Sequence, residues 1–253
     1  MIRPREAWNR RIARAEELEG RYPAAAELLR FYRGIAGFQR DLYLDFEKLK
    51  DPPRDLSLEP ARLPIPLRPY CGRLLRLIQE QAPPELANAA EQLMRSEDWD
   101  AADPASHFLA RVLVQPYAQC LAARERLEPQ GQPTLPDCPF CGEKPVAAVL
   151  RPEGEGGKRW LVCSLCATEW EFRRLVCPSC GEENHEKLPV YVAEEFPHVR
   201  VEACDTCRVY LKSIDMTKDG LAAPEVDELA SVPLDLWASG RGYAKLQPNL
   251  LGL

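Results

Sequence analysis

The chain has 253 residues, a hydrophobic content of 45% and a formal net charge of −6. This length allows one or two domains, and this composition is ordinary for a soluble globular protein. No apolar run approaches the roughly 20 residues of a membrane-spanning helix, and the N-terminus lacks the apolar segment of a secretory signal, so we expect a cytoplasmic protein without a transmembrane segment.

The first half of the chain has the apolar periodicity of α-helices. One stripe runs from Trp8 to Leu18, and a second runs from near Pro23 toward Lys50. The six prolines between Asp51 and Pro69 exclude a regular helix or a central strand there, so we expect an ordered connector. Further helices are predicted around residues 74–79, 84–94 and 104–127, and a last one at 224–238.

The residues 128–136 form a Pro/Gly-rich junction between two compositions. We therefore predict an all-helical domain over residues 1–134. After it we predict two tandem four-cysteine metal-binding units of the rubredoxin-like or zinc-ribbon-like kind, over residues 135–174 and 175–219. A C-terminal helix and tail over residues 220–253 follow. The expected fold class is α+β.

Charge is distributed unevenly between these halves. Residues 1–134 hold 20 basic and 20 acidic residues, whereas residues 135–253 hold 13 and 19 and carry the whole net charge of −6. An acidic second half repels a phosphate backbone. We therefore expect no nucleic-acid partner.

Eight of the ten cysteines fall in four Cys-x-x-Cys pairs within the second half. The pairs are Cys138/Cys141, Cys163/Cys166, Cys177/Cys180 and Cys204/Cys207. In a reducing compartment such pairs indicate metal sites before disulfides, although a disulfide reading remains as an alternative. Four thiolates suit one tetrahedral ion, so eight predict two metal ions per chain.

The cysteine region is an internal repeat. Cys138 and Cys177 each begin a Cys-Pro-x-Cys-Gly motif, and the two motifs lie 39 residues apart. The plain pairs that begin at Cys163 and Cys204 lie 41 residues apart. We therefore predict that the first pair joins the second and the third joins the fourth. A cross-braced arrangement, first with third and second with fourth, is the alternative.

The spacing within each repeat has a chemical reason. Two residues between cysteines let a tight turn direct both sulfurs at one ion, and the following glycine permits the positive φ such a turn needs. Backbone N–H groups in the turn can point at the sulfurs. Alternating apolar residues around 146–150 and 160–162 predict one hairpin, and those around 188–192 and 199–201 predict a second.

The ligand set leaves the metal open. A tetrahedral four-sulfur site fits zinc and also fits a single rubredoxin-like iron, while an iron–sulfur cluster is a third alternative. Trp170, Phe172 and Tyr210 could shield an iron site, but we interpret them as core residues of the hairpins.

The remaining cysteines and the histidines predict no further site. Cys71 and Cys120 lie in helical patterns and are expected to be small core residues. His185 and His198 fall within the second repeat, but four thiolates already complete its site, so we expect surface or capping roles. We find no phosphate-binding loop and no nucleophile motif, and therefore predict no catalytic activity.

The motifs together resemble the formate dehydrogenase accessory protein (FdhE) family. The resemblance lies in the order of the four cysteine pairs and in their flanking residues, such as Glu169-Trp170 and Tyr210-Leu211-Lys212. The segments Asp227-Glu228-Leu229-Ala230 and Leu234-Asp235-Leu236-Trp237-Ala238 are also similar.

The resemblance implies a cytoplasmic, non-catalytic assembly factor. Such proteins bind the catalytic subunit of respiratory formate dehydrogenase and are needed for its activity. The resemblance also implies rubredoxin-like iron on all eight paired cysteines, so iron is favoured over zinc. Two alternatives stay open: a rubredoxin-like electron carrier and a zinc-ribbon nucleic-acid-binding protein.

Overall fold

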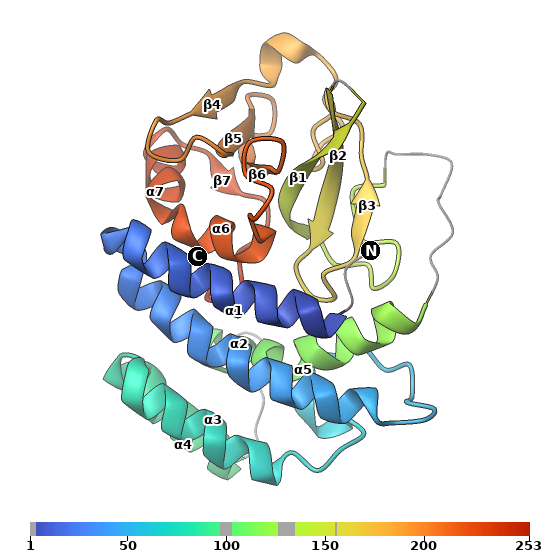
Figure 1. Ribbon diagram of the computed structural model, residues 1–253, viewed down its shortest axis with the longest axis vertical. Helices are drawn as coiled ribbons and strands as arrows, with labels where there is room; N and C mark the ends of the chain where they lie inside the picture. The colour runs from blue at the N-terminus through green and yellow to red at the C-terminus, as the bar shows by residue number, and fades with distance from the viewer. Residues whose placement is uncertain (1–3, 97–102, 126–134, 155) are drawn as a thin grey trace.

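The computed structural model describes residues 4–96, 103–125, 135–154 and 156–253. Helices fill one end of the molecule and a twisted sheet fills the other (Figure 1). This arrangement confirms the expected α+β class, with a helical first half and a sheet region that carries both groups of cysteines. The junction expected at residues 128–136, with its boundary after residue 134, lies largely outside the described residues.

The described residues of the first half form five α-helices, close to the segments that the periodicity predicts. They are α1 (Pro4–Arg21), α2 (Ala26–Glu47), α3 (Arg68–Gln81), α4 (Pro84–Ser96) and α5 (Pro104–Arg124). The helix α5 begins at a capping residue, Asp103, whose carboxylate accepts a hydrogen bond from the Ser106 N–H at 2.7 Å. It packs on α2, where the rings of Phe46 and Tyr117 lie 4.9 Å apart.

The proline-rich connector lies between α2 and α3. It contains one short 3-10 helix, Pro60–Arg62. The Tyr117 hydroxyl of α5 donates to the carbonyl of Pro53, which ties the connector to the helical core. The segment is thus ordered against α5, as its composition predicts.

In the described part of the second half, one sheet of seven strands carries the cysteine repeats. The strands are β1 (Pro145–Glu153), β2 (Gly156–Cys163), β3 (Glu169–Glu171), β4 (Val190–Val192), β5 (Val199–Cys204), β6 (Val209–Asp215) and β7 (Ala244–Lys245). Their order is β3-β2-β1-β6-β5-β4, and β7 pairs with β6. Two of the pairings, β1 with β6 and β6 with β7, are parallel, and the others are antiparallel.

The parallel pairing of β1 with β6 joins the two cysteine repeats. The two predicted hairpins are present as β1/β2 and β4/β5. The strand β6 was not predicted, and it aligns Ala148 with Ser213 and Leu150 with Asp215. The repeats therefore contribute to one continuous sheet, and β1 is buried along most of its length as a central strand should be.

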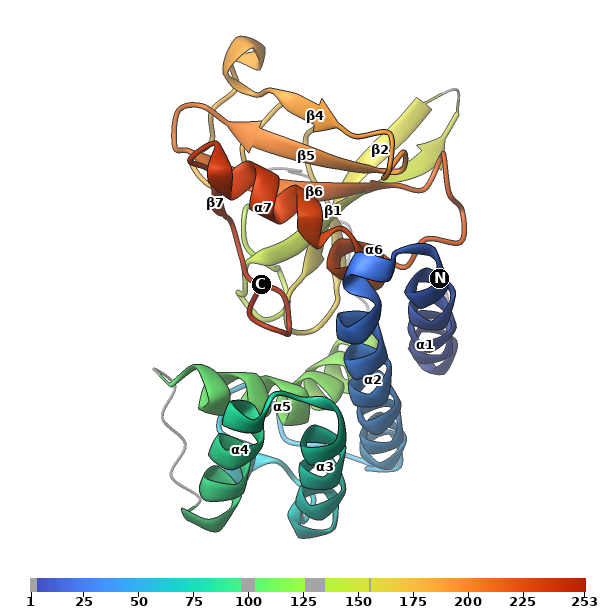
Figure 2. The same cartoon turned by 90° about the vertical axis from the view of Figure 1, so that its left-hand side faces the viewer.

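The predicted C-terminal helix is two helices, α6 (Pro224–Ala230) and α7 (Val232–Gly240). They break at Ser231, two residues before the Pro233 that interrupts the apolar pattern. The helix α6 lies between α1 and the sheet (Figures 1 and 2). Val226 and Leu229 are buried in the same core as the residues of α1 and α2. The C-terminal segment thus holds the helical half against the sheet.

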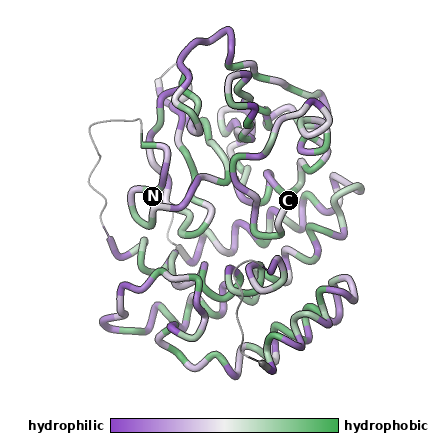
Figure 3. The backbone as a smooth tube through the Cα atoms, turned by 180° about the vertical axis from the view of Figure 1, so that it is seen from behind, coloured by the Kyte–Doolittle hydropathy of each residue, from purple (hydrophilic) through white to green (hydrophobic). Residues whose placement is uncertain are grey.

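Figure 3 shows the hydropathy of each residue along the backbone. The loop around the short 3-10 helix His185–Lys187, at the end of the molecule farthest from the helices, is hydrophilic throughout. Within the described ranges, no helix has both the length and the apolar character that crossing a membrane requires.

Candidate metal centres

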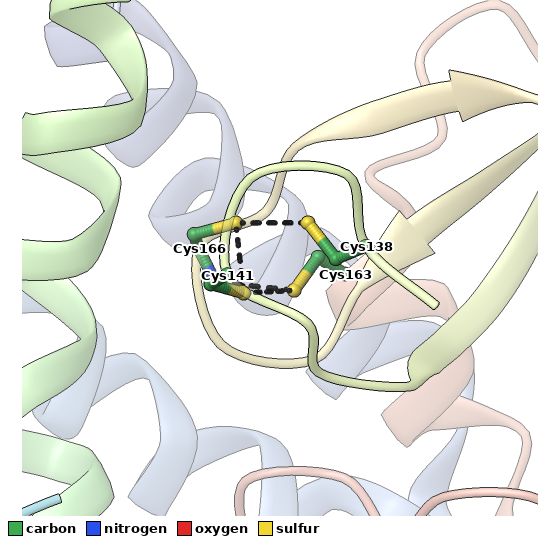
Figure 4. A group of neighbouring side chains, drawn as sticks. All are labelled: Cys138, Cys141, Cys163 and Cys166. Atoms are coloured by element: carbon green, nitrogen blue, oxygen red, sulfur yellow. Dashed lines mark hydrogen bonds between the residues drawn. The ribbon is translucent and has the colours of Figure 1, made fainter. Parts of the chain in front are cut away.

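The structure collects the eight paired cysteines into two groups. Site 1 is Cys138, Cys141, Cys163 and Cys166, and site 2 is Cys177, Cys180, Cys204 and Cys207. In each group the sulfurs all lie within 4.8 Å of one another. The first pair thus meets the second and the third meets the fourth, whereas a cross-braced arrangement would mix the two groups. Figure 4 shows the four sulfurs of site 1 converging.

The spacing of the sulfurs fits a tetrahedral ion better than a disulfide. In site 1 the Cys141 sulfur lies 3.3 Å from that of Cys163 and 3.5 Å from that of Cys166. In site 2 the distances from Cys177 to Cys207 and from Cys180 to Cys204 are both 3.7 Å. Ligands about 2.3 Å from one zinc ion lie about 3.8 Å apart in a tetrahedron. A disulfide would need about 2.05 Å.

Each cysteine pair forms the same tight turn. The residue after the second cysteine takes a positive φ in all four turns: Gly142 (78°), Ala167 (55°), Gly181 (75°) and Arg208 (59°). The turns close through backbone hydrogen bonds, from Gly142 N–H to Cys138 O at 2.9 Å and from Gly181 N–H to Cys177 O at 3.0 Å. The conformation predicted for the two glycines therefore extends to Ala167 and Arg208, where side chains make it strained.

Backbone N–H groups point at sulfur within the turns. Leu165 donates to the Cys163 sulfur at 3.4 Å, and Ser179 donates to the Cys177 sulfur at 3.4 Å. Such bonds moderate the negative charge of a thiolate and orient it. The turns are therefore built to hold charged sulfur as well as to place it.

Each group of thiols interacts strongly within itself. Hydrogen bonds from the other three cysteines lower the pKa of Cys138, and the same set of contacts raises the pKa of Cys163, with burial adding to the rise. In site 2, burial raises the pKa of Cys177 to about 12. Four sulfurs this close cannot all be thiolates without a cation among them, and a divalent ion supplies that charge.

Site 1 is buried against the helical half. Arg111 and Gln115 of α5 each donate to the carbonyl of Ser164, both at 2.8 Å, and Ser164 lies between two ligand candidates in the chain. Gln115 in turn accepts from Gln39 of α2 at 3.1 Å. A chain of hydrogen bonds therefore links α2 and α5 to site 1. The aromatic side chains of Trp170 and Phe172 belong to the same buried cluster as the site 1 cysteines.

Arg111 has an unusual position beside site 1. It is only 3% exposed, and within the described part of the chain its carboxylate partner is Glu143, 3.8 Å away. Its charge also interacts with Cys163 and Cys141, and burial lowers its pKa. A divalent ion on four thiolates has a net charge of about −2, which would balance this guanidinium. The motif analysis missed Arg111, because nothing in its sequence neighbourhood distinguishes it from other helical arginines.

Site 2 is open to solvent. Cys180 is exposed and Cys207 is half-buried, whereas three of the four site 1 cysteines are buried. No helix of the first half supplies a hydrogen bond to the described site 2 turns. Tyr210 lies apart from the sulfurs in the core under α7, where its hydroxyl donates to Asp235 at 2.7 Å. The two sites thus have the same kind of ligands and the same turn geometry, but they differ in how far solvent reaches them.

The surface or capping role expected for His198 is wrong. It is 2% exposed, and its Nε2 lies 2.7 Å from a carboxylate oxygen of Asp227 on α6. The sequence hid this because Asp227 is 29 positions away and is buried only when α6 docks. His185 is exposed on the loop beyond site 2, and Cys120 is buried in the helical core, as expected.

His198, Asp219 and Asp227 form a third cluster whose ligand atoms lie close enough for an ion. The guanidinium of Arg14 already fills the charge requirement there. Its Nη2 lies 2.6 Å from carboxylate oxygens of both Asp219 and Asp227. We therefore interpret this cluster as the ion-paired contact between α1 and α6.

These features define a class: an α+β protein with a helical first half and two zinc-ribbon-like clusters of four cysteines in one sheet. The family model described as "FdhE, central domain" matches residues 137–174, and that described as "FdhE, C-terminal domain" matches residues 175–251. The chain belongs to the FdhE family, as its motifs predict.

Individual relatives agree with this assignment. A "Protein FdhE homolog" of Aquifex aeolicus is 31% identical over 200 residues, which cover 74% of this chain and 70% of that protein. A homologue from Stutzerimonas stutzeri is 30% identical over 285 residues and covers 98% of this chain and 90% of its own. The crystal structure of the FdhE protein from Pseudomonas aeruginosa superposes with a TM-score of 0.76 at 26% identity, covering 98% and 96% of the two chains.

Proposed function

We propose that this chain is a cytoplasmic, non-catalytic accessory protein that binds the catalytic subunit of formate dehydrogenase and supports its maturation. Membership of the FdhE family over nearly the whole chain carries the proposal. The helix α6 packs the helical half against the sheet, and together they offer a surface large enough to hold a partner. A reducing compartment suits eight unbridged cysteines.

We further propose that all eight paired cysteines are metal ligands, four to each of two ions. The sulfur spacings support this, and they suit either a single iron or zinc. The family resemblance favours iron. Bound metal would supply much of the folding free energy of the cysteine turns, since structural sites of this kind contribute about 10 kcal/mol or more.

The test of the binding role is co-purification. The tagged full-length chain would be expressed with the formate dehydrogenase catalytic subunit of the same organism and purified without oxygen. We expect the subunit to be retained by the chain and a subunit-free control to give the chain alone. A wild-type chain that is fully loaded with metal and retains no subunit would refute the binding role.

Metal content and an optical spectrum on the same preparation test the ligand assignment. About two irons per chain, with the charge-transfer bands of a rubredoxin centre after oxidation, would support iron. Two zinc ions and a colourless protein would support the same ligands in a structural role. A chain without bound metal would contradict the ligand assignment while leaving the co-purification result intact.

A rubredoxin-like electron carrier is the second candidate function, and the exposure of Cys180 in site 2 favours it. An exposed sulfur ligand offers a short path for electrons to a docked partner. A reversible one-electron couple at site 2 with a physiological donor would support this function.

Binding to nucleic acid is disfavoured by the charge of −6, and binding to DNA at low salt would reverse that view.

A further inference from the structure

Among the described residues, one face of the sheet beside site 2 exposes large aliphatic side chains. It is formed by β4 and by the segment that enters the Cys177 turn, and we call it the β4 face: Arg174, Leu175, Val190, Val192 and Arg200. Leu175, Val190 and Val192 are 61%, 52% and 70% exposed, which is high for large aliphatic side chains. Exposed aliphatic residues that gather on one face mark an interaction site more often than scattered ones do.

The strand β4 is the edge of the sheet. Among the described strands it pairs only with β5, and its other side carries no partner strand. Val190 and Val192 lie opposite Glu202 and Arg200 in the register, so all four project on the same face. Tyr191 projects to the opposite face, where its ring lies 4.7 Å from that of Trp237 on α7. An edge strand held firmly from behind is a template for an added strand.

A cavity of about 110 Å³ opens within the β4 face. Val190 and Leu175 line it together with Arg159, Arg174 and Arg200. Pockets for free small molecules typically measure about 300–1,000 Å³, so this smaller space suits a single side chain. Because Cys177 and Cys204 form part of its wall, the shape of the cavity depends on site 2.

The charges around the cavity favour a carboxylate. Three arginines line it against a single carboxylate, Glu202, which pairs with Arg159 at 2.7 Å. Arg200 pairs with Asp215 at 3.0 Å, and its Nε and that of Arg159 are buried without a hydrogen-bond partner. Arg174 is exposed, and its guanidinium donates to the carbonyl of Gly157 at 3.3 Å but pairs with no carboxylate of the described residues. This local positive charge contrasts with the acidic chain around it.

We propose that the β4 face binds an extended segment of the client subunit, added as a strand beside β4, with an aspartate or glutamate side chain in the cavity and aliphatic side chains against Val190 and Val192. Main-chain hydrogen bonds to β4 would supply affinity, and the arginine-lined cavity would supply specificity. This proposal rests on the proposed function, because its occupant is the formate dehydrogenase catalytic subunit.

The experiment compares single variants of the full, metal-loaded chain in binding the purified catalytic subunit. Val192→Lys places a charge where an aliphatic contact is proposed, and Arg174→Glu reverses the free charge at the cavity. Leu236→Lys is the matched control, since Leu236 is 71% exposed but lies on α7, behind the sheet. Circular dichroism and metal content establish that each variant is folded. The proposed contacts predict binding about tenfold weaker for both β4-face variants and unchanged for the control.

The outcomes separate this proposal from the proposed function. If the wild-type chain binds the subunit and Val192→Lys binds as tightly as Leu236→Lys, the β4 face is refuted while the accessory role stands. If the wild-type chain binds no subunit, the accessory role fails and the occupant fails with it. If the wild-type chain forms dimers that Val192→Lys converts to monomers, the occupant is a second copy and the client segment is refuted.

Discussion

Arg111 on α5 donates from its Nη2 to the carbonyl of Ser164, in the turn between Cys163 and Cys166, at 2.8 Å. This single bond brings a buried cation from the helical half to the edge of site 1. Glu143 lies 3.8 Å from the guanidinium, and a loaded site 1 would add further negative charge beside this buried cation. Metal at site 1 and the packing of α5 should therefore stabilise each other.

The first prediction is that Arg111→Met weakens metal retention at site 1 and leaves site 2 unchanged. Loss of a charge-compensating neighbour typically costs about 10–100-fold in metal affinity. The measurement is the rate of zinc transfer to a chromophoric chelator: the slower phase, from buried site 1, should become faster, and the phase from site 2 should keep its wild-type rate. Arg76→Met, at an exposed position on α3, is the control. Equal rates in both variants would show that Arg111 has no part in site 1.

The second prediction is that Cys138→Ser destabilises the protein more than Cys180→Ser does. Cys138 is buried and its site is bonded to α5, whereas Cys180 is exposed. Losing one ligand should cost several kcal/mol in either case, a large part of the roughly 5–15 kcal/mol that holds a domain folded. Hydrogen exchange should show faster exchange in β1, β2 and α5 for Cys138→Ser. Exchange confined to the turns in both variants would contradict this.

The continuous sheet couples the stability of the two cysteine repeats. Two separate units would unfold independently when their own ligands are lost. Because β1 pairs with β6, loss of site 1 should also loosen β6, which belongs to the second repeat. We therefore expect increased exchange at Ser213 and Ile214 in Cys138→Ser, and unchanged exchange there would indicate that the repeats are energetically independent.

Local patterns in the sequence predicted the local parts of the structure. Each helix of the first half is a periodic apolar stripe, and each cysteine turn is a four-residue motif, so both are readable without tertiary information. The strand β6 was not readable, because Lys212, Ser213 and Asp215 make it look polar. Lys212 is fully buried there, since Glu228 and Asp235 lie 2.9 Å and 2.7 Å from its ammonium group.

Dependence on distant parts of the chain also explains why the sequence predicts the wrong environment for His198 and does not single out Arg111. His198 and Arg111 each depend on a partner that docks from a distant part of the chain, Asp227 in one case and the Ser164 turn in the other. Their own neighbours in the sequence contain no trace of that contact. Ligands grouped by a short repeat can be predicted, whereas groups brought together by the docking of α5 and α6 cannot.

The third prediction concerns access to the two sites. With zinc bound, Cys180 should be the first of the eight ligands to react with iodoacetamide, because it is exposed. The buried site 1 ligands Cys138, Cys163 and Cys166 should react only after slower opening of the contact with α5. Mass spectrometry of peptides after brief labelling measures the order. Labelling of Cys163 at the same rate as Cys180 would contradict the difference in burial.

The last prediction is that Asp219→Asn lowers stability at pH 7 and flattens its loss in acid. Burial raises the pKa of Asp219, but hydrogen bonds from Arg14 and from the Leu221 N–H outweigh it, so the pKa lies below its usual value. A carboxylate with a lowered folded pKa stabilises the protein above its unfolded pKa of about 4, and this contribution is lost as the pH falls through the folded pKa.

Urea unfolding followed by tryptophan fluorescence from pH 7 to pH 3 measures the effect. At pH 7 we expect Asp219→Asn to cost about 2 kcal/mol, the scale of a hydrogen bond to a charged group. The difference from wild type should begin to shrink near pH 4, where the unfolded carboxylate takes up its proton, and should disappear only as the pH falls through the lowered pKa of the folded protein. Asp51→Asn, at an exposed position, is the control and shares any acid release of metal. A constant difference across this range would mean that the charge of Asp219 does not hold α1 to the loop before α6.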